Sequence, residues 1–344
     1  MKNIPSGGKK VEELWNKISD VDSNFRRDME FIEGEMKRCI SDSHPSKLYN
    51  ASRHFIKTGG KRVRPALVIL SYGAVSGNAE MNYDHITPVA IAVELIHTAT
   101  IIHDDIIDRS SMRRGVETVN AKWGNDTALI AGDLIFSRAF GLVGVHEKRE
   151  LSGIISNACI RLAEGEILET LHTGDMEMTE EVYLEVVERK TATLFEACTK
   201  CGAILGGGDE KEISALSKYG YHLGIGFQMT DDILDIVARE RTLGKPVGVD
   251  ISMGRPTFVI LHALEVAREK DKKELVSILK RKMGSDTDIK RALEIIKNTN
   301  SIEYASMRAK SQMEMAKKEI GHLKDTESKR ALEIIAEYAV DRSF

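Results

Sequence analysis

The chain has 344 residues, which is enough for one large core or two domains. Its 49 basic and 53 acidic residues give a formal net charge of −4, so we expect no general affinity for nucleic acid. Prolines (6) and aromatic residues (6%) are scarce, and this composition favours an all-α protein.

The N-terminal sequence MKNIPSGGKK lacks the apolar stretch of a secretory signal peptide. The longest apolar segment, Ile86–Ile102, contains Glu94 and His97, so we interpret it as a core helix and predict no transmembrane segment. Cys198 and Cys201 form a Cys-x-x-Cys pair without a second pair, which favours the buried side of a helix over a zinc site. Together these features favour a cytoplasmic, reducing environment.

Apolar residues at helical spacing recur along almost the whole chain, and neither a strand pattern nor an interdomain linker is evident. We therefore predict a single all-α domain over residues 1–344, with residues 1–9 loose. Polar loops are expected at 109–123 and 238–253, and the length of the second predicts a functional flap. The predicted helices cover 11–18, 24–40, 48–57, 66–74, 84–108, 127–144, 151–171, 180–203, 211–237, 257–270, 272–282, 287–298, 301–324 and 327–340.

A basic turn with the sequence GGKRVRP, Gly59–Pro65, precedes the apolar helix at 66–74. Lys61, Arg62 and Arg64 lie beside the start of that helix, where free backbone N–H groups attract anions. The turn is therefore a candidate phosphate site. A solvated basic turn without a ligand is the alternative.

The apolar helix at 84–108 ends in the acidic sequence HDDIID. Asp104 and Asp108 are four residues apart, so their carboxylates share one helix face, one turn apart. Buried carboxylates that face each other are costly unless a cation joins them, and oxygen ligands suit magnesium. Arg113 and Arg114 follow, which suggests a phosphate held by guanidinium groups and metal together. An acidic helix cap with a basic loop is the alternative.

The same acidic pattern occurs again in GFQMTDDILDI. Asp231 and Asp235 repeat the four-residue spacing, with Asp232 between them. The apolar run Tyr219–Met229 precedes them. Two apolar helices that both end in this pattern are difficult to explain by packing alone. We therefore predict that both acidic faces line one cavity, where several cations balance a diphosphate.

Three further residues lie on the predicted helices at positions that suggest a site. His97 shares a helix face with Asp104, seven residues later, so it either lines the cavity or forms a hydrogen bond in the core. Lys190, before an apolar run, either extends toward water or binds a phosphate. Gly165, between two glutamates, would permit the close approach of another element.

Five segments in order closely resemble the trans-isoprenyl (polyprenyl) diphosphate synthases: GGKRVRP, DDIIDRSSMRR, Lys190–Thr191, GFQMTDDILD and Gly244–Lys245. The resemblance extends from about residue 40 to the end. It implies the isoprenoid synthase fold, with antiparallel helices around a deep central cavity, in a magnesium-dependent homodimer. It also implies a transferase that condenses isopentenyl diphosphate with an allylic diphosphate, head to tail, into an all-trans polyprenyl diphosphate.

The resemblance assigns roles to residues of this chain. Thr191 and Gln228 would direct their dipoles toward the allylic cation that forms when diphosphate leaves. The implied metal ligands are Asp104, Asp105, Asp108, Asp231 and Asp235. The residues implied to bind the leaving diphosphate are Lys190, Lys245 and Arg113. Those implied to bind isopentenyl diphosphate are Lys61, Arg64, His97 and Arg114. The implied catalytic set is Asp104, Asp108, Lys190, Asp231 and Lys245.

Product length in that family depends on the residues one turn before the first acidic motif, which form a floor under the growing chain. Ala99 and Thr100 are small, so the floor is open here and we expect a product longer than geranylgeranyl. The candidates for a deeper stop are Leu95 and Ile96 on the same helix, or Phe136 and Phe140, four residues apart on the next helix.

Three alternative functions are considered beside this one. A non-catalytic partner subunit of the same fold usually lacks an acidic motif, whereas both motifs are intact here. A terpene cyclase generally carries one such motif and lacks the basic turn. A structural helical protein with incidental acidic caps would lose no activity if both motifs were removed.

Overall fold

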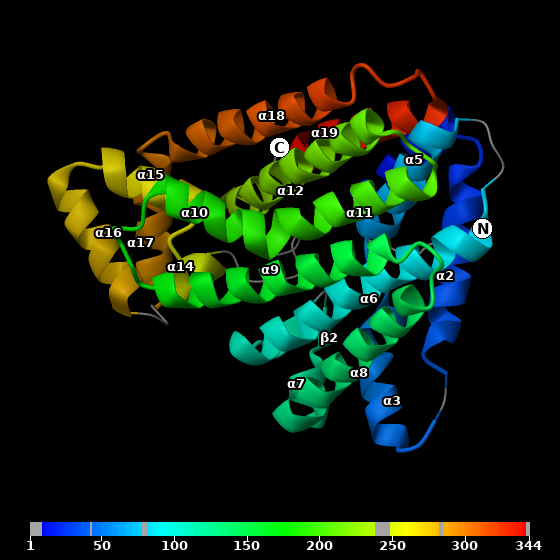
Figure 1. The fold of residues 1–344 in the computed structure, drawn as a ribbon. Coiled ribbons are helices and arrows are strands. Elements are labelled where there is room, and N and C mark those ends of the chain that lie inside the picture. Colours follow the sequence, from blue (N-terminus) through cyan, green and yellow to red (C-terminus); the bar gives the residue numbers. More distant parts are fainter. Residues whose placement is uncertain are drawn as a thin grey trace. The chain divides into compact units, whose positions relative to one another are not determined.

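The computed structural model describes residues 9–41, 43–77, 81–113, 115–237, 248–281 and 285–341. These residues are almost entirely helical, as predicted, and the sheet among them is a two-stranded hairpin (Figure 1). Of the residues predicted to be loose, 1–8 lie outside the described residues. The chain forms two compact units. Unit 1 comprises 1–159, 194–220 and 319–335, and unit 2 comprises 160–193, 221–318 and 336–344.

Unit 1 is organised around α6, Tyr83–Ile107, which packs against α2, α5 and α8. Helix α8 runs beside α6 (Figure 1). Apolar side chains surround α6 instead of forming a single stripe, and such a helix must be buried on most sides. Other elements of unit 1 are α1 (Lys9–Val21), α2 (Phe25–Cys39), α3 (Ser46–Ser52), α4 (His54–Thr58), α5 (Val63–Ser76), β1 (Met112–Arg113), β2 (Val116–Glu117), α7 (Val119–Trp123) and α8 (Asn125–Gly144).

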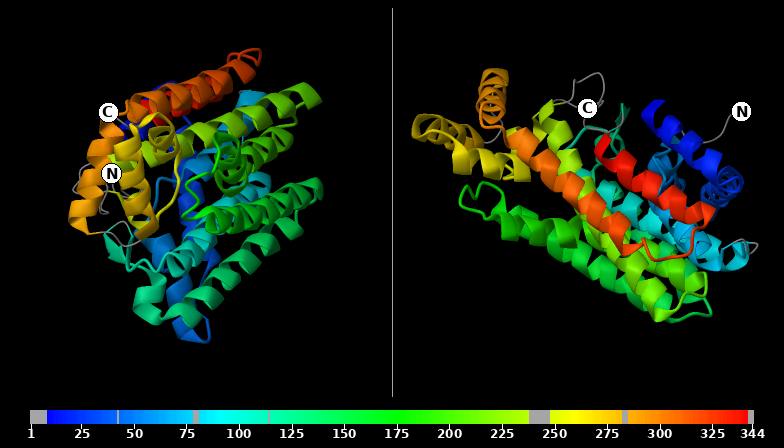
Figure 2. Two further views of the ribbon diagram at one scale, coloured as in Figure 1. Left: turned by 90° about the vertical axis from the view of Figure 1, so that its left-hand side faces the viewer. Right: turned by 90° about the horizontal axis from the view of Figure 1, so that it is seen from above.

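Unit 2 has an apolar core that includes the fully buried side chains of Met229, Phe258 and Leu275. In this unit α15, α16 and α17 form a compact group (Figure 2). The elements of unit 2 are α10 (Glu180–Val187), the π-helix η1 (Glu188–Ala192), α14 (Val249–Met253), α15 (Phe258–Val266), α16 (Glu269–Arg281) and α17 (Asp286–Lys297). Helices with residues in both units are α9 (Glu150–His172), α11 (Thr193–Leu205), α12 (Glu210–Val237), α18 (Ser301–Glu319) and α19 (Glu327–Asp341).

The helix predictions agree with the structure except in a few segments. The loop predicted at 109–123 contains the hairpin β1–β2 and the short helix α7. The loop predicted at 238–253 ends in α14. The helix predicted at 180–203 contains η1, and the one predicted at 48–57 is divided between α3 and α4. Strands of two residues and helices of five are too short for residue periodicity to reveal.

Two helices of the described chain, α6 and α8, are long and apolar enough to span a membrane by length and composition alone. The most apolar window of α6 is 72% buried inside the protein, in agreement with the predicted core helix, and that of α8 is 33% buried. Core helices of proteins that do not span membranes pass the same test, so these two helices are weak evidence for a membrane span.

Gly202 lets α11 approach α5 within backbone contact. A Cβ atom at this position would lie 2.3 Å from the Val68 carbonyl oxygen, which cannot yield as a flexible side chain would. We expect Gly202→Ala to lower the free energy of unfolding by about 3 kcal/mol, measured by denaturant titration. Gly153→Ala on α9 is the control, because nothing lies within 4 Å of its added Cβ. Alanine there should raise the free energy of unfolding by about 0.5 kcal/mol, and equal stabilities of the two variants would contradict this account.

Candidate active site

The first acidic motif, at the end of α6 in unit 1, divides its three carboxylates by burial. Asp104 and Asp108 are half-buried, whereas Asp105 has an exposed fraction of 0%. The helical period explains the division, because positions 104 and 108 share one face and position 105 turns toward the core. Asp104 and Asp108 are therefore the pair that a cation from solvent can reach.

Asp105 is bound within unit 1. Its Oδ1 accepts an ion-paired hydrogen bond from Arg113 Nε at 2.8 Å. Its backbone carbonyl accepts a hydrogen bond from Asn120 Nδ2 at 3.2 Å, and the same amide binds the Ser110 carbonyl at 3.0 Å. These bonds hold Arg113 of β1 and Asn120 of α7 against the end of α6. Asp105 was predicted to be a metal ligand, but complete burial and an ion pair favour a role in holding Arg113.

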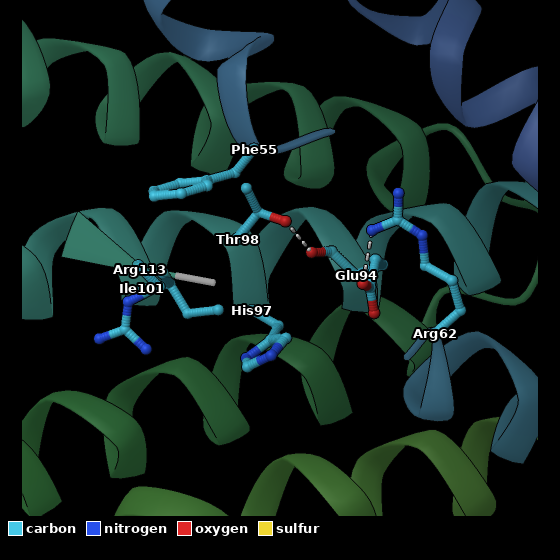
Figure 3. Close-up of a pocket in the computed structure, with 7 residues that line it drawn as sticks. All are labelled: Phe55, Arg62, Glu94, His97, Thr98, Ile101 and Arg113. Atoms are coloured by element: carbon cyan, nitrogen blue, oxygen red, sulfur yellow. Dashed lines mark hydrogen bonds and ion pairs between the residues drawn. The ribbon is translucent and has the colours of Figure 1, made fainter. Parts of the chain in front are cut away.

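His97 lines a pocket in unit 1, as its position on the face of Asp104 suggested. The cavity measures about 10 Å³, which is room for about one water molecule. Figure 3 places Arg113 on one side of His97 and Arg62 with Glu94 on the other. Two guanidinium groups, an imidazole and the Glu94 carboxylate therefore line this cavity. The remaining lining residues are Phe55, Thr98 and Ile101.

The basic turn places its three cations differently. Lys61 and Arg64 are half-buried, whereas Arg62 is buried. The Arg64 guanidinium carbon lies 4.9 Å from the centre of the Phe195 ring on α11, in cation–π geometry. Helix α5 begins at Val63, three residues earlier than predicted, so Arg64 stands in its first turn beside free N–H groups.

The residues predicted to control product length lie on α6 and α8 in unit 1. Ala99 is fully buried, and the half-buried Thr100 donates to a backbone carbonyl of its own helix at 2.8 Å. Phe136 is half-buried, with its ring centre 5.9 Å from that of His103. Phe140 is 37% exposed. Of the two aromatic candidates, Phe136 is therefore the one directed toward the interior of unit 1.

The second acidic motif, on α12 in unit 2, shows the same division. Asp231 and Asp235 are half-buried, whereas Asp232 is buried. Asp232 Oδ2 accepts a hydrogen bond from the Tyr183 hydroxyl at 2.6 Å, and Oδ1 accepts one from Gln228 Nε2 at 2.9 Å. Burial raises the pKa of Asp232 to about 7, although both hydrogen bonds lower it. In both motifs the first and fifth carboxylates are accessible and the second is fixed internally.

Thr191 and Gln228 are brought together in unit 2. Thr191 Oγ1 donates to Gln228 Oε1 at 2.9 Å, while the other end of the same amide donates to Asp232. The Asp232 carboxylate accepts and therefore binds the NH₂ end of the amide, and the Thr191 hydroxyl, which can donate or accept, donates to the oxygen end. The direction of the Gln228 dipole is therefore fixed by Thr191 and Asp232.

Lys190 lies in the π-helix η1, next to α9. Its Nζ lies 2.7 Å from Glu166 Oε2 and 2.6 Å from Glu169 Oε2. A Cβ atom at Gly165 would lie 2.4 Å from the Lys190 backbone nitrogen, so the close approach predicted at Gly165 is confirmed. Short π-helical turns are frequent at functional sites. The wider turn and the glycine together place Lys190 against α9.

Asp250 and Arg255 lie close to Glu169 and to the second acidic motif, although neither was predicted to be a site residue. Arg255 Nε lies 3.5 Å from Glu169 Oε2, and its Nη1 lies 3.8 Å from Asp250 Oδ1. The Asp235 carboxylate accepts hydrogen bonds from the backbone N–H groups of Val249 and Asp250 at the start of α14. The signal in the sequence was only the unusual length of the predicted loop, which cannot identify individual residues.

Negative charge is crowded around this second motif. Burial and the neighbouring carboxylates of Asp235 and Asp232 raise the pKa of Asp250 well above its ordinary value. Raised carboxyl pKa values indicate negative charge that nearby cations do not fully compensate. A divalent cation bound by the carboxylate oxygens would supply the missing positive charge. The donors near Asp231 therefore fit magnesium in charge and in chemistry.

Some predicted features lie beyond the part of the chain that the structure describes. Arg114, Lys245 and residues 238–247 of the predicted flap are among them. Within the described ranges, no three His, Cys, Asp or Glu side chains form a metal-binding group. The two acidic motifs belong to different units, with Asp104 in unit 1 and Asp231 in unit 2.

Comparisons with known proteins agree with these features. Residues 45–296 match the family model described as Polyprenyl synthetase. A short chain isoprenyl diphosphate synthase of Methanothermobacter thermautotrophicus is 40% identical over 329 residues, which are 94% of this chain and 99% of that protein. An octaprenyl diphosphate synthase of Haemophilus influenzae is 38% identical over 85% of this chain and 87% of its own. The crystal structure of a Caulobacter crescentus polyprenyl synthase complexed with calcium and isoprenyl diphosphate matches with a TM-score of 0.87, 30% identity and full coverage of both chains (100%).

Proposed function

The chain belongs to the polyprenyl synthetase family, and on this basis we propose that it is a trans-prenyltransferase. It condenses isopentenyl diphosphate with an allylic diphosphate into an all-trans polyprenyl diphosphate. The observation that carries the proposal is the repeated acidic motif. Asp104 and Asp108 on α6, and Asp231 and Asp235 on α12, are all half-buried at one-turn spacing after apolar helices.

These four accessible carboxylates hold magnesium ions. Bound magnesium supplies the positive charge that neutralises the allylic diphosphate. Support comes from the oxygen donors, from the raised pKa of Asp250 near Asp235, and from calcium in a related solved structure. Asp105 contributes by keeping Arg113 beside the first motif.

Lys190, Arg113 and Lys245 bind the leaving diphosphate by charge. Glu166 and Glu169 restrain Lys190 before substrate arrives, so its ammonium loses little freedom on binding. As the C–O bond breaks, the allylic carbon becomes cationic. The aligned dipoles of Thr191 and Gln228 stabilise that charge.

Isopentenyl diphosphate is held by Lys61, Arg64, His97 and Arg114. Support comes from Arg64, which is half-buried in the first turn of α5, where backbone N–H groups attract anions. The double bond of isopentenyl diphosphate attacks the cation, a carbon–carbon bond forms, and one proton passes to the released diphosphate. No side chain has to act as a strong base in this scheme.

The product is longer than geranylgeranyl diphosphate. Relatives range from a short chain synthase to an octaprenyl synthase, so family membership leaves product length open. The support is local: Ala99 is a small, fully buried residue five positions before Asp104, with Thr100 beside it. Phe136 is the proposed stop.

Ala99→Tyr is expected to shorten the product, because a phenol ring at this buried site would block the growing chain. Chain length is measured by mass spectrometry of the hydrolysed products. Ala90→Tyr is the matched control: Ala90 is also fully buried on α6, but nine residues away and hence on the opposite face. Unchanged length in Ala99→Tyr, or equal shortening in both variants, would exclude Ala99 from the floor.

The active form is a cytoplasmic homodimer without a nucleic-acid partner. Leu129, Ile130 and Phe140 leave apolar surface exposed on α8, which supports a second copy as its cover. All four cysteines are free, which supports a reducing compartment. Sedimentation of a monomer at micromolar concentration would contradict the dimer.

The function is tested with the purified chain, labelled isopentenyl diphosphate, magnesium and each allylic primer in turn. The expected result is prenyl product with release of diphosphate, abolished by a chelator and restored by magnesium. A chain that is inactive alone but makes product with another subunit would support the partner-subunit alternative. Cyclic hydrocarbon as the product would support a terpene cyclase.

A further inference from the structure

Arg62, the middle cation of the basic turn, differs from its neighbours in being enclosed by acids. Its side chain is 4% exposed, whereas Lys61 and Arg64 are half-buried. Arg62 Nε and Nη2 lie 2.8 and 3.3 Å from the two Glu33 carboxylate oxygens on α2. Its Nη1 lies 2.9 Å from Glu94 Oε1 on α6. The guanidinium thus joins two helices through its planar fork of donors.

The buried charges of this network balance. Burial alone would lower the pKa of Arg62, but Glu94 and Glu33 raise it above its ordinary value, so the guanidinium stays charged. Lys37 supplies the second positive charge, with its Nζ 3.3 Å from Glu33 Oε1. Two carboxylates and two cations therefore compensate one another, which a buried ion network requires.

The backbone of Arg62 is also fixed. Its φ of +50° is in the left-handed region, which non-glycine residues rarely adopt. Arg62 Nη2 donates to the Ile56 carbonyl at 3.0 Å, and the Arg62 carbonyl accepts from Ala66 N at 3.2 Å. The side-chain network offsets the strain of this conformation.

The network reaches the pocket that contains His97. Arg62 and Glu94 both line this pocket, and Figure 3 shows them on the side of His97 opposite Arg113. Glu94 lies one turn before His97 on α6 and Thr98 donates to its carbonyl at 2.8 Å, so the same stretch of helix carries the network and the imidazole.

We propose that the Glu33–Arg62–Glu94 network positions the basic turn for isopentenyl diphosphate, without itself contacting the substrate. The inference rests on the proposed function, since it concerns the binding of one of the two substrates. It makes the three cations unequal: Lys61 and Arg64 bind the diphosphate, and Arg62 sets their geometry. Loss of the network should therefore weaken the binding of isopentenyl diphosphate and leave the binding of the allylic substrate almost unchanged.

The test uses two variants. Arg62→Lys keeps the positive charge but loses the planar set of guanidinium donors. Glu94→Gln keeps the size and shape of the side chain but loses its negative charge. We expect each to raise KM for isopentenyl diphosphate about tenfold, with less than a twofold change in KM for the allylic substrate. Calorimetric titration with isopentenyl diphosphate alone should show the same loss of affinity. Thermal unfolding identifies a variant that fails to fold. In that case the KM values of the other variant decide whether the network positions the basic turn.

One control accompanies these variants. Arg53→Lys alters another buried arginine of unit 1, which lies outside the network. It should keep KM for isopentenyl diphosphate within twofold of the wild type. Equal increases in both KM values, or no increase in either, would overturn the inference about Arg62. A wild-type chain that makes no product would instead refute the proposed function.

Discussion

Asp231→Ala and Asp104→Ala are each expected to lower kcat about 1,000-fold, because each removes an accessible carboxylate ligand and with it about 4 kcal/mol of charge stabilisation. Both residues are half-buried at helix positions where the next aspartate in the chain is fixed internally, so that aspartate cannot replace them. Steady-state kinetics with isopentenyl diphosphate and an allylic primer measure the loss.

The controls for these variants remove an acid from the same helix at its opposite end. Asp84→Ala lies in the first turn of α6, and Glu210→Ala lies in the first turn of α12. Both side chains are exposed, and both variants should keep kcat within twofold of the wild type. Full activity in Asp104→Ala and Asp231→Ala together would revive the view of the motifs as structural caps.

Gly165→Ala is expected to lower kcat about 100-fold without contacting substrate. The added Cβ would lie 2.4 Å from the Lys190 nitrogen and 2.8 Å from the Arg189 carbonyl carbon, so η1 must move away from α9. A displacement of about 1 Å at a catalytic group is enough for such a loss. The KM for isopentenyl diphosphate should stay within twofold, because Lys190 acts on the allylic diphosphate.

Gly153→Ala is the matched control for this variant, on the same helix α9 with nothing within 4 Å of the added Cβ. It should retain wild-type kinetics. Lys190→Ala should match Gly165→Ala in kcat if the glycine acts through Lys190. A Gly165→Ala protein with normal kcat and normal unfolding would show that the close approach has no catalytic role.

The helices were largely predictable because each signal is local. The apolar period of α6 and α12, and the four-residue spacing of their aspartates, depend only on neighbouring residues in the chain. The close approach at Gly165 was also predictable, because a glycine within a helix has no Cβ atom to keep a neighbouring element away. The family resemblance followed from the order of five such local motifs.

Features that depend on tertiary contacts were not predictable in the same way. The sequence HDDIID does not show which of Asp104 and Asp105 is accessible to a cation. The ion pair between Asp105 and Arg113, a tertiary contact, distinguishes them. GGKRVRP likewise presents three equivalent cations until Glu33 and Glu94, distant in sequence, enclose Arg62. Asp250 lies within the loop predicted at 238–253 and Arg255 lies just after it, where no periodicity marks a residue as part of a site.

The most direct test of the account is the product length made by the purified wild-type chain alone, from isopentenyl diphosphate and farnesyl diphosphate with magnesium. Mass spectrometry of the hydrolysed products should show prenols longer than geranylgeraniol, and the Asp104→Ala, Asp231→Ala double variant should make none. No elongation of any allylic primer by the wild-type chain, or wild-type activity in the double variant, would contradict the account.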